Sequence, residues 1–298
     1  MEFLVQKAID LGFAPIVAIQ MATINVARHF AIDDFIGGIA PGKYADIIII
    51  PELRTIQAEY VISNGQVVAR NGQLVVQPRK QAYPESMRNS IHLPRNFEAN
   101  DFAIPVESDR SQVKVRVIDQ VTDLVTREAI IDIPVSEGRL QPDPTNDILK
   151  VATIDRTYLP GKTFVGLVRG IGLKHGAIAT STAWDSCDII VVGASEADMA
   201  QAVNRIRELD GGVVVCADGK ILADMPLPLA GLISSEPMET IAQRSYSIQQ
   251  AATNLGCPSP DIHTTVDVLG TSAIPFLRIS EHGLVDIREN RFVDLIVD

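Results

Sequence analysis

The sequence predicts an α+β protein built in two regions, and three observations indicate this class. Short β-type segments, several of them joined by Asn-Gly or Asp-Gly, are spread over most of the 298 residues. Two longer segments in the second region repeat apolar residues at helical spacing. A polar stretch with three prolines, from Gln77 to Phe102, separates the two regions. Because proline opposes both helix interiors and central strands, we expect a domain boundary in this stretch.

The first region is predicted to contain two helices followed by short strands. Met1–Leu11 places its apolar residues on one helical face, and Pro15 suits the first turn of a second helix that runs to Phe30. Ala45–Ile50 is almost entirely apolar, which is typical of a strand covered on both faces. Asn64-Gly65 and Asn71-Gly72 favour tight hairpin turns, because both residue types tolerate positive φ.

The second region alternates strands with two helices. Ser195 is a good N-cap for a helix that ends at Gly211, and Pro237 opens a second helix that ends at Gly256. Ser136–Asp147, which is rich in glycine and proline, is predicted to be a surface loop. The predicted strands of this region are Val113–Ile118, Leu149–Ile154, Phe164–Ile171, Ala177–Thr182, Ile189–Val192, Val213–Cys216 and Lys220–Ala223.

The overall composition limits the classes of function. The net charge of −11 opposes non-specific binding to nucleic acid, which needs a basic surface. No apolar run is long enough to span a bilayer, and the N-terminus does not have the pattern of a secretory signal, so we expect no membrane partner. The three cysteines lie far apart, which fits a reducing cytoplasm better than a disulfide framework.

A motif in the first region resembles a known junction. The string from Gly37 to Ile50 has the pattern G-x-I-A-P-G-x-x-A-D-I-I-I-I. It resembles the point in metal-dependent amidohydrolases where the last helix of the (β/α) barrel connects to a small β-sandwich. In that superfamily the catalytic metals lie upstream of this point. The resemblance implies that residues 1–32 are terminal barrel helices and that residues 33–85 belong to the β-sandwich.

Three longer blocks in the second region resemble the C-terminal domain of bacterial adenine deaminases. They are Phe164–Ala179, then Ile189–Gly193 with Asp198–Ala200, and finally Gly211–Val215 continuing to Leu232. Residues 86–298 are therefore identified as this mixed-sheet α+β domain. The resemblance implies hydrolysis of adenine to hypoxanthine and ammonia, a divalent metal (manganese or iron) that activates water, and a homo-oligomer for the complete enzyme.

The sequence departs from the family in two places. The five histidines are scattered and none forms His-x-His, so we expect no complete metal site in this chain. The family's His-Asp-Ser-His loop here reads Trp184-Asp185-Ser186-Cys187. We therefore interpret the chain as the C-terminal fragment of a deaminase, inactive by itself. The alternative is a non-catalytic subunit or relic that docks onto a separately encoded barrel.

The candidate site residues each have a structural alternative. Asp185 and Ser186 are candidate catalytic residues that contact substrate or a metal-bound water, although an Asp-Ser pair also suits an Asx-type turn or a helix cap. His175 is a candidate proton carrier, although Lys174-His175-Gly176 suits a polar turn. Trp184 is a candidate stacking surface for a purine, although it also suits the space of the absent histidine. Cys187 is predicted to be a buried thiol, and Gly170, Gly172 and Gly176 are predicted to allow close packing at strand ends.

Overall fold

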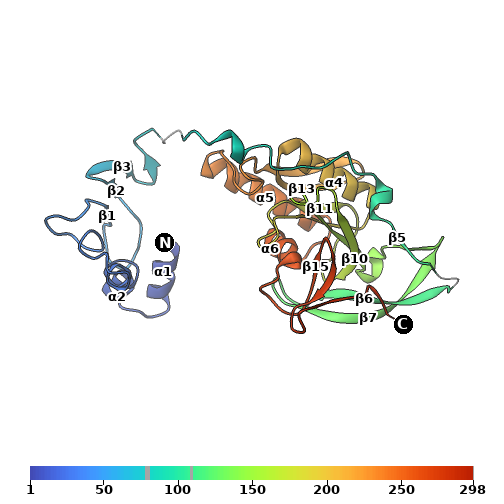
Figure 1. Ribbon diagram of the computed structural model, residues 1–298. Helices are drawn as coiled ribbons and strands as arrows, with labels where there is room; N and C mark the ends of the chain where they lie inside the picture. The colour runs from blue at the N-terminus through green and yellow to red at the C-terminus, as the bar shows by residue number, and fades with distance from the viewer. Residues whose placement is uncertain (78–80, 108–109, 298) are drawn as a thin grey trace. The chain divides into compact units, whose positions relative to one another are not determined.

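The computed structural model describes residues 1–77, 81–107 and 110–297. The chain forms two compact units, Met1–Ala82 and Tyr83–Asp298 (Figure 1). The division at residues 82 and 83 lies inside the proline-containing stretch that the sequence marks as a boundary.

The first unit combines short helices with one sheet. The helices are α1 (Glu2–Asp10), α2 (Pro15–Met21) and α3 (Ile24–His29). The strands β1 (Ile47–Ile49), β2 (Tyr60–Ser63), β3 (Gln66–Arg70) and β4 (Gln73–Leu74) pair in that order, each antiparallel to the next. Both Asn-Gly turns are confirmed, with φ of 49° and 77° at Asn64 and Gly65, and 49° and 76° at Asn71 and Gly72.

Two sequence-based expectations for this unit are wrong. The helix predicted over Pro15–Phe30 is interrupted, because Thr23 takes φ −131° and its hydroxyl donates to the Ile19 carbonyl. The strand at β1 is not covered on both faces, since Ile48 is 63% exposed. Among the described residues of this unit, the predicted β-sandwich part contains the one sheet β1–β4, and its membership of a sandwich stays a prediction.

The second unit is built around a large mixed sheet. Its described strands follow the order β14-β13-β11-β12-β9-β10-β6-β7-β8-β5, and β18 also pairs with β6 near the C-terminus. Neighbours are antiparallel except β10 and β6, which are parallel. The strands are β5 (Ile104–Pro105), β6 (Gln112–Gln120), β7 (Thr126–Ser136), β8 (Arg139–Leu140), β9 (Leu149–Ile154), β10 (Thr163–Arg169), β11 (Ala177–Thr180), β12 (Ile189–Gly193), β13 (Gly212–Ala217), β14 (Lys220–Pro226) and β18 (Ile296–Val297).

A smaller sheet and several helices complete this unit. The small sheet contains β15 (Leu277–Ser280), β16 (Gly283–Asp286) and β17 (Arg291–Val293). The α-helices are α4 (Glu196–Leu209), α5 (Met238–Asn254) and α6 (Ile262–Asp267). The 3₁₀ helices are η1 (Glu85–Met87), η2 (Ala99–Phe102), η3 (Pro144–Asn146) and η4 (Val268–Gly270).

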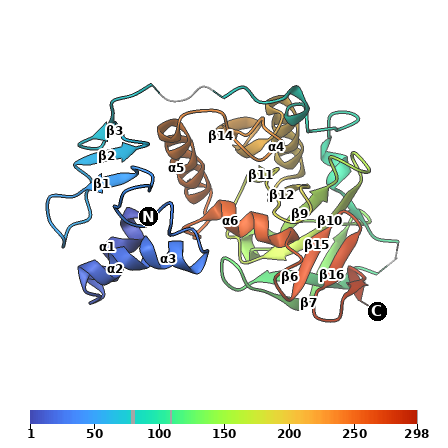
Figure 2. The same ribbon diagram turned by 60° about the vertical axis from the view of Figure 1, so that its left-hand side comes forward.

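The helices cover both faces of the large sheet, which explains its apolar strands. Side chains alternate between faces along a strand. On β13, Val213 and Val215 belong to the same core cluster as α5 and α6, whereas Val214 and Cys216 belong to the cluster of α4. Figure 2 shows α5 and α4 with β14 and β11 between them. Because both faces are buried, the central strands read as continuous apolar runs.

The structure confirms most of the predicted elements of this unit. The Ser195 hydroxyl accepts a hydrogen bond from the Asp198 backbone nitrogen at 3.3 Å and so caps α4 as predicted. A Cβ on Gly170 would lie 2.2 Å from the Gln120 carbonyl oxygen, which confirms close packing at the end of β10. The prediction that Ser136–Asp147 is a surface loop is wrong in part, because this segment contains β8 and η3.

Candidate functional site

The loop from Ser181 to Asp188 carries most of the predicted site residues. It connects β11 to β12, which are antiparallel neighbours, so the chain must reverse direction here. β11 ends at Thr180, two residues earlier than predicted, because Ser181 leaves the strand and donates through its hydroxyl to the Gly231 carbonyl at 2.6 Å. The first residues of the loop, Ser181–Ala183, are buried, and we call them the base of the loop.

That base contains a polar cluster from α6. The Thr182 hydroxyl oxygen lies 2.7 Å from Nε2 of His263 and 2.8 Å from Oδ2 of Asp267. The same His263 nitrogen lies 3.2 Å from Asp267. Burial raises the pKa of the Asp267 carboxyl, and the nearby His263 opposes this shift. Because one imidazole nitrogen makes both contacts, the cluster differs from a relay in which a histidine bridges a hydroxyl and a carboxylate through two nitrogens.

The tip of the loop is exposed and makes few contacts. Trp184 is 52% exposed. The Asp185 carboxylate accepts hydrogen bonds from the Ser272 hydroxyl at 3.2 Å and the Ala273 backbone nitrogen at 3.3 Å. The Ser186 hydroxyl accepts a hydrogen bond from the Asp188 backbone nitrogen at 3.3 Å. Ser186 therefore makes a contact within its own turn, whereas Asp185 contacts the distant segment at Ser272 and Ala273.

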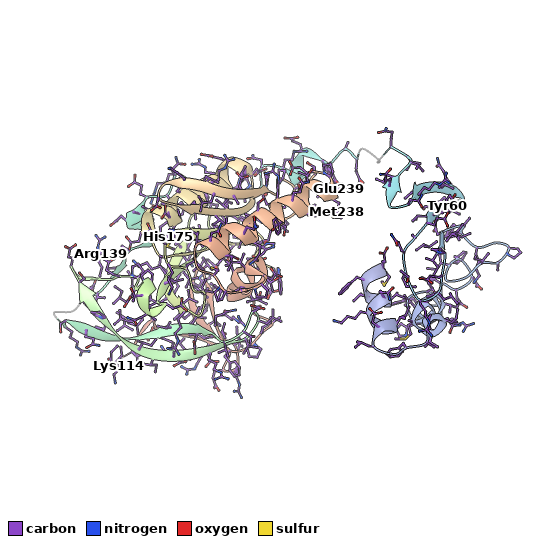
Figure 3. The ribbon with its side chains drawn as sticks, turned by 180° about the vertical axis from the view of Figure 1, so that it is seen from behind. Tyr60, Lys114, Arg139, His175, Met238 and Glu239 are labelled. Atoms are coloured by element: carbon purple, nitrogen blue, oxygen red, sulfur yellow. The ribbon has the colours of Figure 1, made fainter. Side chains whose placement is uncertain are left out.

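The structure places His175 away from this tip. His175 is exposed and precedes β11, whereas the loop follows β11, so the two lie at opposite ends of that strand. Figure 3 labels His175 on the ribbon of the second unit. Gly176 has φ +78°, which confirms the predicted turn. The structure thus brings Trp184, Asp185 and Ser186 together in one loop but does not bring His175 to them.

A buried arginine fixes the far side of the loop. Arg156, only 3% exposed, donates through Nε to the Cys187 carbonyl, through Nη1 to the Ser90 carbonyl at 3.0 Å and through Nη2 to the Ala230 carbonyl at 3.1 Å. Cys187 is half-buried and has φ +59°, and its backbone nitrogen donates to Ala183. The thiol predicted to be buried is therefore partly accessible.

Sequence reasoning missed two groups at this site. The sequence analysis did not single out His263 or Asp267, yet both contact Thr182 at the base of the loop. Their i, i+4 spacing was the available signal, since it places both side chains on one face of a helix. Asp188 was also missed, because it reads as the ordinary polar residue before an apolar strand.

The donors of the described residues do not fit a divalent metal. Within residues 1–77, 81–107 and 110–297 no group of three or more His, Cys, Asp or Glu side chains could hold such an ion. A pocket of about 390 Å³, lined by residues that include His92, Arg207 and Asp210, contains none of the predicted site residues. Among the described helices, none is long and apolar enough to cross a membrane.

Comparison with known proteins assigns the family. The profile of the adenine deaminase C-terminal domain matches residues 123–291, and that of the amidohydrolase family matches residues 1–75. An adenine deaminase of Clostridium botulinum (strain Langeland) is 36% identical over 299 residues, covering 100% of this chain and 50% of the relative.

Two further relatives align in the same way. Adenine deaminases of Moorella thermoacetica and Roseobacter denitrificans are each 38% identical, over 297 and 298 residues, covering 99% of this chain and 50% and 49% of those relatives. The chain spans about half the length of the curated relatives it matches. The chain therefore belongs to the adenine deaminase family.

Proposed function

We propose that this chain is the carboxy-terminal portion of an enzyme that hydrolyses adenine to hypoxanthine and ammonia. The observation that carries the proposal is the alignment of the whole chain with relatives named adenine deaminase at 36% to 38% identity. The order of the two profile matches, amidohydrolase first and adenine deaminase C-terminal domain second, supports the same assignment.

We further propose that the polypeptide of these 298 residues has no deaminase turnover by itself. In the family a divalent ion, manganese or iron, supplies the chemistry. The side chains of the described residues form no group that fits that ion. We therefore assign its ligands to an amidohydrolase barrel that lies outside these 298 residues. The free thiols of Cys187, Cys216 and Cys257 agree with a reducing compartment, and we place the reaction in the cytoplasm.

Within this proposal the loop at Trp184 is the part of the chain that meets the substrate. Trp184, Asp185 and Ser186 are exposed together at its tip. A purine stacked on the indole would bring its ring edge near the Asp185 carboxylate. His175 is a weaker candidate, because β11, at about 3.3 Å per residue, separates it from the loop by more than the width of a purine.

The test is reconstitution with a barrel from a relative. This chain would be produced alone and together with the front half of the Moorella thermoacetica enzyme, and ammonia release from adenine would be measured with added Mn²⁺. We expect turnover only from the combination, and its loss after chelation. Turnover by the highly purified chain alone would refute the second proposal. No turnover by a stable complex, beside an active whole Moorella enzyme, would refute the first.

A non-catalytic docking role is the second candidate, and one observation favours it. Several apolar side chains of the first unit are exposed, among them Phe3, Leu4, Leu11, Phe13, Ile16 and Phe30. Barrel helices ordinarily bury such a face. Co-purification of this chain with a separate protein that contains His-x-His would support complementation. A monomer that binds no barrel half would oppose it, and a homo-oligomer would instead support self-association.

A further inference from the structure

One buried arginine contacts three segments of the second unit. Arg156 follows β9 and is 3% exposed. Its Nε atom donates to the Cys187 carbonyl, Nη1 to the Ser90 carbonyl at 3.0 Å, and Nη2 to the Ala230 carbonyl at 3.1 Å. A guanidinium is a planar fork of five N–H donors, so one side chain can bind several acceptors in fixed directions. Arg156 therefore joins the loop of residues 181–188, which we call the Trp184 loop, to two segments that are distant in sequence.

The turn after Arg156 is ordered by its neighbour. The Asp155 carboxylate accepts hydrogen bonds from the backbone nitrogens of Thr157 at 2.6 Å and Leu159 at 2.7 Å. These bonds fix the backbone on both sides of Arg156. A side chain that orients a loop needs such a fixed starting point, because its own acceptors are otherwise met only part of the time.

The first distant segment is residues 87–92, which lie shortly after the boundary between the two units and which we call the Ser90 segment. The Asp210 carboxylate accepts hydrogen bonds from the backbone nitrogen of Ser90 at 2.8 Å and from those of its two neighbours. The His92 backbone nitrogen donates to the Arg156 carbonyl at 3.2 Å. Arg156 thus binds this segment through its backbone as well as its side chain, and Asp210 holds the segment from another side.

The second distant segment is the turn at residues 229–231. A Cβ on Gly231 would lie 2.8 Å from Nη1 of Arg156, so the guanidinium packs directly against the backbone of this turn. The Gly231 carbonyl accepts a hydrogen bond from the Ser181 hydroxyl at 2.6 Å, at the base of the loop. Both ends of the Trp184 loop therefore bind the same turn, Ser181 directly and Cys187 through Arg156.

The conformation of Cys187 needs a restraint from outside the loop. Its φ of +59° lies in the left-handed region, which is unfavourable for a residue other than glycine and persists where the surroundings impose it. The hydrogen bond from Arg156 to the Cys187 carbonyl supplies such a restraint, and hydrogen bonds from a charged donor are stronger than neutral ones. Arg156 therefore sets the path of the chain at this end of the loop.

We propose that Arg156 is the positioning residue of the Trp184 loop, because it holds the loop at Cys187 on two anchored segments. A displacement of the Ser90 segment then moves Trp184. Since the Ser90 segment lies just after the boundary between the units, Arg156 links the loop to the part of the chain by which the second unit is joined to the first. The coupling belongs to this chain alone, whereas its consequence for adenine rests on the proposed function.

The single tryptophan provides the first test, in the intact chain. Acrylamide quenching of its emission, corrected for lifetime, measures how far the loop opens. Arg156→Ala should raise the quenching rate, by up to about twofold because Trp184 is already 52% exposed. Arg156→Lys should raise it as well, since an ammonium keeps the charge but not the planar fork. Circular dichroism confirms that each variant is folded, and Arg156→Lys keeps the test decisive if Arg156→Ala is not.

Lys150→Met is the matched control, because it removes another buried cation of the same unit. Lys150 is fully buried on β9, donates to the Phe102 carbonyl at 2.9 Å and pairs with Glu196. Neither partner lies in the Trp184 loop, so Lys150→Met should keep the quenching rate of the unmodified chain. An equal rise in the Lys150 and Arg156 variants would overturn the proposal, since the loosening would then be general. Unchanged quenching in the Arg156 variants would overturn it too.

Asp210→Asn tests the link to the Ser90 segment without changing Arg156. Asparagine has the same size and tolerates the φ of +56° at this position, but it loses an acceptor for the backbone nitrogens of the segment. We expect Asp210→Asn to raise Trp184 quenching, and to raise it less in a chain that also carries Arg156→Ala. No rise in the single variant, or equal rises in both backgrounds, would overturn the coupling through Arg156.

A kinetic measurement connects this role to the proposed function. In the complex with the front half of the Moorella thermoacetica enzyme, Arg156→Ala should raise the KM for adenine by up to about tenfold, which is the contribution of one aromatic contact. The kcat should change less, because the chemistry belongs to the barrel. An unchanged KM would overturn the positioning role. A complex that is inactive with the unmodified chain would refute the proposed function, and the quenching results would still decide the role of Arg156.

Discussion

The two units of this chain differ in how far they bury their own apolar residues. In the described part of the first unit the buried apolar side chains are Val5, Ala18 and Ala27, while many larger ones on α1–α3 are exposed. The second unit has three core clusters in which leucine, isoleucine and valine are fully buried. The second unit therefore has an extensive apolar core of its own, whereas the first unit leaves most of its large apolar side chains exposed.

Truncating one leucine in each unit should give the largest contrast. Leu167 is fully buried on β10, and Leu4 on α1 is 60% exposed. We expect Leu167→Ala to lower the free energy of unfolding by about 3 kcal/mol, because a cavity adds to the lost transfer energy. Leu4→Ala should change it by less than about 0.5 kcal/mol. Urea unfolding followed by circular dichroism, which reports both units, measures the two values.

The result for Leu4 also tests the docking role. In a complex with a barrel half, Leu4→Ala should weaken association although it leaves the isolated chain unchanged. A large destabilisation of the isolated chain by Leu4→Ala would mean that the first unit already buries this face, and the contrast between the units would fail.

The central strands of the second unit could be predicted from the sequence, while the packing of the first unit could not. The strand predicted at Leu149–Ile154 is found with those bounds, because an apolar run covered on both faces leaves little ambiguity. The similar run at Ala45–Ile50 misled the same reasoning. The apolar composition of this run predicts that it is buried, but it does not indicate whether the same unit would bury it.

The candidate site was only partly predictable for a different reason. Resemblance to the family pointed to Trp184, Asp185 and Ser186, and the structure places these residues in the loop between β11 and β12. The groups that contact it come from distant segments: Thr182 contacts Asp267, and Asp185 contacts Ser272. These contacts arise from the packing of α6 and of the segment that follows η4, and no local pattern around Thr182 or Asp185 specifies them.

Helix caps give a smaller contrast between the units. The Ser195 hydroxyl caps α4, whereas Thr23, at the same position of α3, makes no capping hydrogen bond. Ser195→Ala should cost about 1 kcal/mol, because a backbone donor of the first turn loses its partner. Thr23→Ala should cost less than about 0.5 kcal/mol. Ser195→Asp should restore most of the loss, and equal costs for both alanine variants would contradict this account.

The smallest expected effect concerns an ion pair of the second unit whose contribution to the free energy of unfolding depends on pH. Nε of Arg169 lies 2.7 Å from Oδ1 of Asp119, and Nη2 lies 3.0 Å from Oδ2. The Arg169 hydrogen bonds hold the pKa of Asp119 below its usual 3.8. A depressed pKa in the folded state stabilises the protein above about pH 4, and this contribution is lost as the pH falls through the folded value.

The exposure of the Arg169 side chain keeps this contribution small, so the direction of its change with pH is more informative than its size. The Arg169 side chain is 40% exposed, so screening by water keeps the contribution below about 1 kcal/mol. Arg169→Gln should therefore lower the free energy of unfolding slightly at neutral pH, and the difference from the unmodified chain should vanish near about pH 2. Arg28 on α3 makes no described ion pair, so Arg28→Gln should show no such pH dependence. A difference for Arg169→Gln that grows on acidification would contradict the ion pair, because protonated Asp119 carries no charge for Arg169 to stabilise.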